Sequence, residues 1–142
     1  MSTEREFSAG GVVVRGEECV VIVPVKRSQQ GKRVLGLPKG HRDGDESAEE
    51  AATREVREET GVVAELVEPL GEAGYWYQRK GRSIHKQVRF FRFRYVSGST
   101  DDHDEEIEEA RWMALAEAAE KLTYEGEREM AARALSRVQA DR

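Results

Sequence analysis

Three glutamates near the middle of the chain have the type and spacing of a cation-binding group. Glu55, Glu58 and Glu59 lie three and four residues apart, so in a helix their carboxylates share one face. Three like charges in one patch raise the cost of ionising each of them, and no structural need explains the patch. A hard divalent cation offsets that cost, since Mg²⁺ takes oxygen ligands and keeps positions for water and substrate phosphates. The cluster therefore predicts a metal site, with a solvated acidic face as the alternative.

The residues around the cluster follow a longer pattern. Residues 40–62 read G-x5-E-x7-R-E-U-x-E-E-x-G-U, where U is apolar, and Glu46 and Arg54 stand at two of the fixed positions. Agreement at nine positions by chance is on the order of 10⁻⁹ at average residue frequencies. The pattern resembles the signature of the Nudix hydrolases, and on it the chain is identified as a member of that family.

This resemblance implies an α/β fold, the Nudix α/β/α sandwich with a mixed sheet, in a single domain over residues 1–142. It also implies roles for the matched positions. Glu58 and Glu59 would be the principal metal ligands, with the Gly40 carbonyl assisting. Glu55 would be a ligand or the base that activates water.

Three further residues would support this group. Arg54 would orient Glu55, and Glu46 would be a supporting acid, although its place at a helix start would also suit the helix dipole. Relatives often add an acid from outside the signature. Glu106, six residues before Trp112, matches that position best, so the predicted metal group also includes Glu106.

Family members cleave a nucleoside diphosphate linked to another group, by attack of water at a phosphorus atom. Mg²⁺, with Mn²⁺ as the alternative, would bridge phosphate oxygens and neutralise charge on the leaving phosphate. No Ser or Cys nucleophile motif competes with this chemistry.

The residues that enter the signature indicate a phosphate-rich substrate. Residues 37–41 resemble the corresponding segment of Nudix hydrolases of diadenosine and diphosphoinositol polyphosphates, in which Lys39 and His41 would stand beside the phosphates. Aromatic side chains of the run 75–77 could stack on a base. The candidate substrate contacts are Lys39, His41, Arg27, Arg33, Tyr75, Tyr77 and Lys86.

Three functions stay open on the sequence alone. Hydrolysis of dinucleoside polyphosphates, such as diadenosine tetra- or hexaphosphate, is favoured. A pyrophosphohydrolase of nucleoside triphosphates, including oxidised ones, is the second. A non-catalytic nucleotide sensor is the third, and the intact set of acids argues against it. A triphosphate at an RNA 5′ end is a weaker candidate.

The composition and the charge pattern limit the partners and the location that we expect for the protein. The 142 residues carry a net charge of −5, and 36% are charged. Basic segments (24–42 and 73–100) alternate with acidic ones (43–59 and 101–109). This pattern suits the binding of a polyanion that arrives with a cation, and it argues against the binding of a nucleic-acid tract.

No apolar run reaches the roughly 20 residues that span a bilayer, and the start lacks a signal pattern, so we expect a cytoplasmic protein. We expect it to be a monomer or a homodimer. Cys19 stands alone in an apolar run and is expected to be buried.

Local patterns predict the elements that position these residues. Strands are expected at 11–14, 19–25, 34–37, 62–67 and 109–115, a loop at 39–46, and a hairpin with arms 74–78 and 84–96. Alternation in the second arm places Phe91, Phe93 and Tyr95 on one face and Val88, Phe90, Arg92 and Arg94 on the other. Ser47 and Glu50 form a capping box for a helix ending near residue 60, where Gly61 stops it. Two more helices are expected at 114–121 and 125–139.

Overall fold

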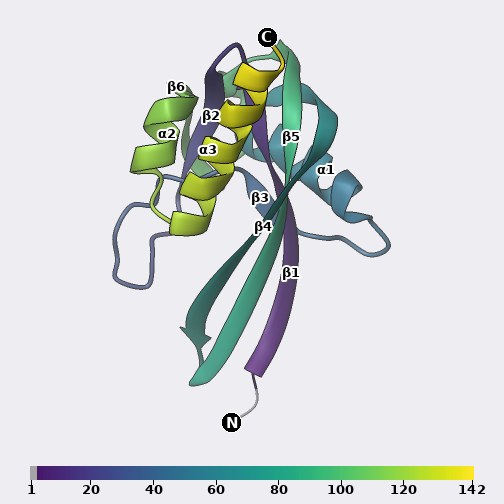
Figure 1. Cartoon of the computed structure of the whole chain (residues 1–142). Helices are drawn as coiled ribbons and strands as arrows, with labels where there is room; N and C mark the ends of the chain where they lie inside the picture. The colour runs from purple at the N-terminus through teal and green to yellow at the C-terminus, as the bar shows by residue number, and fades with distance from the viewer. Residues whose placement is uncertain (1–2) are drawn as a thin grey trace.

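A six-stranded mixed sheet forms the centre of the molecule (Figure 1). The structure, a computed structural model, describes residues 3–142. In chain order the elements are β1 (Thr3–Arg15), β2 (Glu18–Pro24), β3 (Lys39–His41), α1 (Ala48–Thr60), β4 (Val62–Arg79), β5 (Arg82–Gly98), the 3-10 turn η1 (Thr100–Asp102), β6 (Ile107–Ala114), α2 (Leu115–Lys121) and α3 (Glu125–Ala140). The sheet order is β4-β5-β1-β2-β6, and β3 pairs with β1.

One pairing makes the sheet mixed. β1 runs parallel to β5, whereas the other neighbours are antiparallel. Helix α1 covers one face, and α2 and α3 cover the other (Figure 1). The predicted α/β/α sandwich is confirmed.

Each face of the sheet has its own apolar core. Phe91 and Phe93 pack with Val56 of α1, and Val88 and Phe90 pack with Met130 of α3. This is the alternation predicted for the second arm of the hairpin, because successive side chains of a strand point to opposite faces. The two cores hold α1 and α3 on opposite sides of the same strands.

Local signals fix the limits of α1. The Ser47 side chain accepts from the Glu50 N–H, and the Glu50 side chain accepts from the Ser47 N–H, so the predicted capping box is present. The helix ends at Gly61, whose φ of 79° is the left-handed conformation that glycine adopts without strain.

Three predictions about the strands are wrong. Residues 34–37 form no strand and meet the sheet only through a bridge between Gly36 and Ile22. The next strand, β3, falls instead at Lys39–His41, which was expected to be loop. The strands expected at 62–67 and 74–78 are one continuous strand, β4, whose bulges interrupt its alternation.

Three strands extend past the helices as an arm, formed by residues 3–7 of β1, 74–79 of β4 and 82–87 of β5 (Figure 1). Trp76 is 66% exposed there and stacks on His85, with ring centroids 4.5 Å apart. The arm lies next to β3, since Glu6 of the arm lies close to His41 of β3.

Two further expectations concern single features. Cys19 is buried as predicted, and burial raises the pKa of its thiol to about 12, so it stays protonated. Among residues 3–142, no helix is long and apolar enough to cross a bilayer.

Candidate functional site

Arg54 lies at the centre of the carboxylates on α1. Its Nε is 2.9 Å from Glu46 Oε2, and its Nη1 is 2.6 Å from Glu55 Oε1 and 3.2 Å from Glu58 Oε2. Its Nη2 donates to the His41 carbonyl at 2.8 Å. One guanidinium therefore ties the first half of the signature to the helix, since its five donors form a fixed fork.

The Gly40 backbone and the Glu55 carboxylate approach each other closely. A Cβ on Gly40 would lie 2.2 Å from Glu55 Oε2. The Glu55 side chain is only 13% exposed, and burial raises the pKa of its carboxyl although Arg54 opposes the shift. The Glu55 carboxylate thus sits against the main chain of the loop that enters the signature.

Glu59 is the most strongly perturbed acid of the group. Its Oε1 accepts the Lys39 N–H at 2.8 Å. Burial raises the pKa of its carboxyl to about 8, the Lys39 contact lowers it, and Glu55 and Asp104 raise it. A carboxylate held in such surroundings is ionised at neutral pH only when further positive charge is nearby.

The acidic loop before β6 lies over this face of α1. The Asp104 N–H donates to the Glu58 carbonyl at 2.9 Å, and the Glu106 N–H donates to Asp104 Oδ1 at 3.1 Å. The charge of Glu106 raises the pKa of Glu55. The loop therefore brings Glu106, which the sequence singled out, and Asp104, which it did not, to the signature carboxylates.

The donor set fits a hard divalent cation. Within residues 3–142, no three His, Cys, Asp or Glu side chains converge in an arrangement that could hold a metal ion, and the Arg54 guanidinium lies among the carboxylates instead. All available ligands are nevertheless oxygens, and the Gly40 backbone meets Glu55 where any Cβ would block the approach.

Lys39 reaches the opposite side of β3, where a buried acid meets it. Its Nζ is 3.1 Å from Oε2 of Glu127, a completely buried residue of α3. Burial alone would lower the pKa of Lys39, but Glu127 and then Glu59 outweigh it and raise that pKa. The sequence prediction missed Glu127, although its spacing with Met130, Ala131 and Ala134 places it on the buried stripe of α3.

Lys86 lies next to this pair and has no ion-pair partner among the described residues. It stands across from Tyr75 on β4 and from Glu6 on β1. Burial lowers the pKa of its ammonium, and the charge of Lys39 lowers it further. Two cations therefore lie close together in a largely buried region, where the charges of Glu6, Glu127 and Glu59 only partly offset the lowering of the Lys86 pKa.

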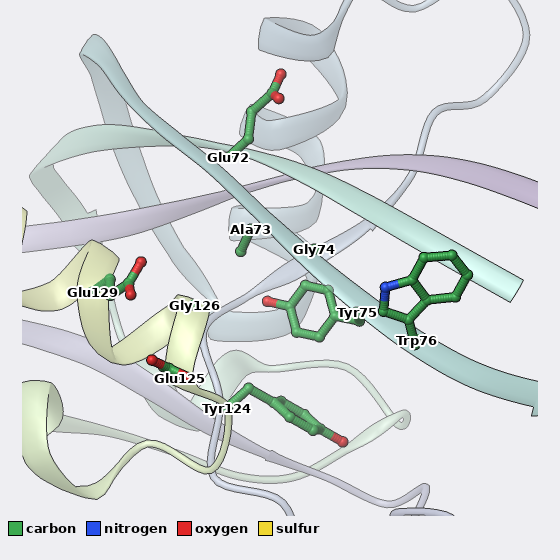
Figure 2. A pocket seen from close by; sticks show the side chains of 9 residues that line it. All are labelled: Glu72, Ala73, Gly74, Tyr75, Trp76, Tyr124, Glu125, Gly126 and Glu129. Carbon is green, nitrogen blue, oxygen red and sulfur yellow. The ribbon is translucent and has the colours of Figure 1, made fainter.

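An open groove includes Tyr75, the neighbour of both lysines. It has a volume of about 490 Å³ and is lined by residues of β4 and of the start of α3: Glu72, Ala73, Gly74, Tyr75, Trp76, Tyr124, Glu125, Gly126 and Glu129. Figure 2 shows Tyr75 extending from β4 toward the start of α3, whereas Trp76 projects away from it. The Tyr75 ring meets Tyr124 edge-on, and its centroid lies 5.8 Å from Lys39 Nζ.

The other candidate contacts are engaged elsewhere. Tyr77 donates to Glu6, and His41 Nε2 lies 3.8 Å from Glu6 Oε2. Arg27 and Arg33 both pair with Glu108 of β6. Tyr77 and His41 thus stand at the edge of the site, and the two arginines are tied to β6.

Comparisons with known proteins show the family of the chain. A family model described as NUDIX domain matches residues 5–134, so the chain belongs to the NUDIX domain family. Over 136 residues it is 37% identical to "Putative mutator protein MutT4" of Mycobacterium tuberculosis, covering 92% of this chain and 55% of that protein. It is 40% identical over 108 residues to Nudix hydrolase 4 of Arabidopsis thaliana, covering 75% of this chain and 51% of that protein. The chain thus spans about half the length of these curated relatives.

Solved structures share the fold. A NUDIX hydrolase from Nitrosomonas europaea superposes with a TM-score of 0.74 at 21% identity, covering 92% of this chain and 88% of that one. A C. elegans Ap4A hydrolase in a binary complex gives a TM-score of 0.68 at 19% identity, covering 96% and 99%. At these identities the likeness supports the architecture and not a substrate.

Proposed function

We propose that this chain is a metal-dependent hydrolase of phosphoanhydride bonds in nucleoside diphosphate-linked substrates. One observation carries the proposal. Lys39 joins an acidic face to a cationic one, because its N–H binds Glu59 of α1 while its ammonium lies beside Lys86 on the other side of β3. Acids suited to a divalent cation thus stand next to cations suited to phosphates.

The cation would be Mg²⁺ or Mn²⁺, held by carboxylates of α1 and the acidic loop and by a backbone carbonyl: Glu55, Glu58, Glu59, Glu106 and Gly40. When bound it would neutralise charge on the phosphates and make water easier to ionise.

The chain's own groups would supply position and proton transfer. Glu55 would accept the proton of the attacking water, and its raised pKa suits a base that works near neutral pH. Arg54 would keep that carboxylate in place through its 2.6 Å contact. Lys86 would bind phosphate oxygens, as would the donors of Lys39 that do not face Glu127.

Dinucleoside polyphosphates are the substrates that this arrangement fits best. The groove beside Tyr75 and Tyr124 offers aromatic rings to one nucleoside, and Lys39 lies between that groove and Glu59. The arm extends the surface beyond Lys86 and ends in the exposed cation Lys80, which would face the distal phosphates.

A nucleoside triphosphate is the second candidate, and the ion pairs of the arm favour it. Arg79 pairs with Glu4 and Glu6, and Arg82 pairs with Glu4, so these two positive charges of the arm are already neutralised. A shorter phosphate chain would not need the arm. The printed name of the M. tuberculosis relative, a mutator protein, agrees with such a substrate.

The test is a substrate panel with the purified chain. Diadenosine tetra- and hexaphosphate, nucleoside triphosphates and ADP-ribose would each be incubated with Mg²⁺, with and without excess chelator, and the phosphate products quantified. We expect chelator-sensitive turnover with the highest kcat/KM on a diadenosine polyphosphate. Binding of these nucleotides without turnover of any of them would contradict the proposal and favour a sensor.

A further inference from the structure

Glu127 is a completely buried carboxylate that lies outside the signature and is fully engaged. Its Oε1 accepts the Leu37 N–H at 2.6 Å, and its Oε2 accepts the Tyr75 O–H at 2.7 Å. The Lys39 ammonium lies 3.1 Å from the same Oε2. Burying a carboxylate is costly unless each oxygen is bonded, and here a backbone N–H, a phenol and an ammonium compensate it.

The segment that Glu127 holds is the one that orients Glu59. Glu127 binds residue 37 through the main chain and residue 39 through the side chain, and the N–H of Lys39 donates to Glu59. Between them, the Pro38 carbonyl accepts the Gly11 N–H at 3.1 Å. These contacts fix residues 37–39 relative to the sheet. A displacement of Lys39 would therefore also displace the Glu59 carboxylate that its N–H binds.

We propose that Glu127 is a positioning residue, which acts from α3 through Leu37 and Lys39 to fix the Glu59 carboxylate and the Lys39 ammonium in the site. The inference rests on the proposed function, since it concerns the same cation and phosphates. It adds a connection across the sheet, from the C-terminal helix to the metal-site helix.

The chemistry requires a carboxylate at this position. A glutamine of the same shape has a single acceptor oxygen and an amide NH₂, so it cannot accept from both Leu37 and Tyr75 while facing an ammonium. Glu127→Gln therefore weakens the contacts that hold residues 37–39, with almost no change in side-chain volume. Glu120→Gln on α2 is the matched control, because it makes the same change at an exposed residue with no ion pair among the described residues.

The first measurement does not depend on turnover. Titration of Mn²⁺ into the metal-free protein, followed by electron paramagnetic resonance, gives the dissociation constant. We expect Glu127→Gln to weaken Mn²⁺ binding and to lower kcat/KM with Mg²⁺, each by about 10–100-fold, as is typical when the partner of a metal ligand is lost. Glu120→Gln should match the wild type. Wild-type Mn²⁺ affinity and kcat/KM in Glu127→Gln, whatever its melting temperature, would overturn the inference.

A double-mutant comparison separates positioning from a general effect on folding. If Glu127 acts through Lys39, then Glu127→Gln should change kcat/KM by less than about threefold in a Lys39→Met background, because residues of one network do not act additively. Full additivity would overturn the inference. Should Glu127→Gln fail to fold, Lys39→Met/Glu127→Met replaces the buried pair by apolar side chains, which buried pairs often tolerate. Wild-type Mn²⁺ affinity in that variant would also overturn it.

Failure of the proposed function gives a different result. In that case the wild-type chain itself would bind no Mn²⁺ and hydrolyse nothing on the panel. An active wild type with an equally active Glu127→Gln variant would remove only the role of Glu127.

Discussion

The two faces of the sheet near β3 handle charge in opposite ways. On the α1 face several partly exposed carboxylates share one guanidinium, that of Arg54, which contacts Glu46, Glu55 and Glu58 at once. On the α3 face the Lys39 ammonium and the Glu127 carboxylate form one buried pair. The first arrangement has more negative charge than its arginine neutralises, whereas the second is a one-to-one pair with Lys86 beside it.

This difference indicates on which face the charged side chains can exchange their contacts when a cation or a substrate binds. A shared guanidinium leaves each carboxylate with unused lone pairs, so a divalent cation can join the α1 group without first breaking a buried pair. Rearranging a buried pair costs several kcal/mol, so the α3 face keeps its geometry while substrate binds and leaves. The comparison predicts that α1 variants change the chemistry and that α3 variants change binding.

The largest effect is expected at the candidate base on the α1 face. Glu55→Gln should lower kcat by about 10²–10⁴-fold, the usual contribution of a general base. Mn²⁺ affinity should change less than in Glu58→Gln, because Glu58 would be a principal metal ligand. Steady-state kinetics with Mg²⁺ on the best panel substrate measures the loss. If Glu106→Gln shows the larger loss of kcat, the base belongs to the acidic loop and not to α1.

The candidate metal ligands come next. Glu58→Gln and Glu59→Gln should each reduce kcat by about 10²-fold or more, because each removes an anionic oxygen from a site that stabilises charge. Mn²⁺ titration should show weaker binding in both variants, with folding retained by circular dichroism. Near-normal turnover in both would show that this helix is not the metal site, and the contrast between the two faces would lose its functional meaning.

The pKa of Glu59 predicts a pH-dependent stability in the metal-free protein. Burial raises that pKa from 4.5 to about 8, so the folded state prefers the protonated acid. The stability that the protonated acid contributes is fully present below about pH 4.5 and is lost as the pH rises through about 8. Glu59→Gln does not titrate, so the melting temperature of the variant minus that of the wild type should increase over this window and then level off. A constant difference across the window would contradict the assigned pKa.

A binding effect is expected at Lys86 on the α3 face. Lys86→Met should lower kcat/KM about tenfold, or about 1.4 kcal/mol, mostly through KM, as for one charge-assisted bond to phosphate. The melting temperature without substrate should not fall, because the variant relieves a desolvated cation next to Lys39. Lys26→Met is the control, since it removes an exposed lysine that has no ion pair among the described residues. A loss confined to kcat would contradict the division of roles between the faces.

The sequence predicted best the features that depend on near neighbours. The capping box at Ser47, the stop at Gly61 and the spacing of the three glutamates all lie within one helix, so local rules determine them. The sequence predicts two strands where the structure has the single strand β4, because the bulges near residues 64, 67 and 70 break the alternation on which strand prediction depends. Strand β3 has only three residues and exists through its pairing with β1, a contact that local patterns do not contain.

The same limit applies to the site. The carboxylate face of α1 could be predicted from spacing, but the partners of the basic residues could not. The pairing of Arg79 and Arg82 with Glu4 depends on β1 lying parallel to β5, more than seventy residues away in the chain. Glu127 could have been suspected, because an acid on the apolar stripe of a helix needs a buried partner. Its partner, Lys39, becomes evident only when α3 is placed against the sheet.

The smallest effect is expected on the arm, where it separates the two substrate candidates. Replacing Arg79, Lys80 and Arg82 together by alanine removes three positive charges but leaves Glu4 and Glu6 without these partners. Because both arginines of this set are already paired with acids, kcat/KM for diadenosine hexaphosphate should fall only a few-fold more than for a nucleoside triphosphate, a difference of about 1 kcal/mol. Glu4→Gln is the control of opposite sign: it frees Arg82 and leaves Arg79 with Glu6 alone, so it should raise kcat/KM for the longer substrate at low salt. Equal changes for both substrates in both variants would remove the arm from substrate recognition and favour the triphosphate.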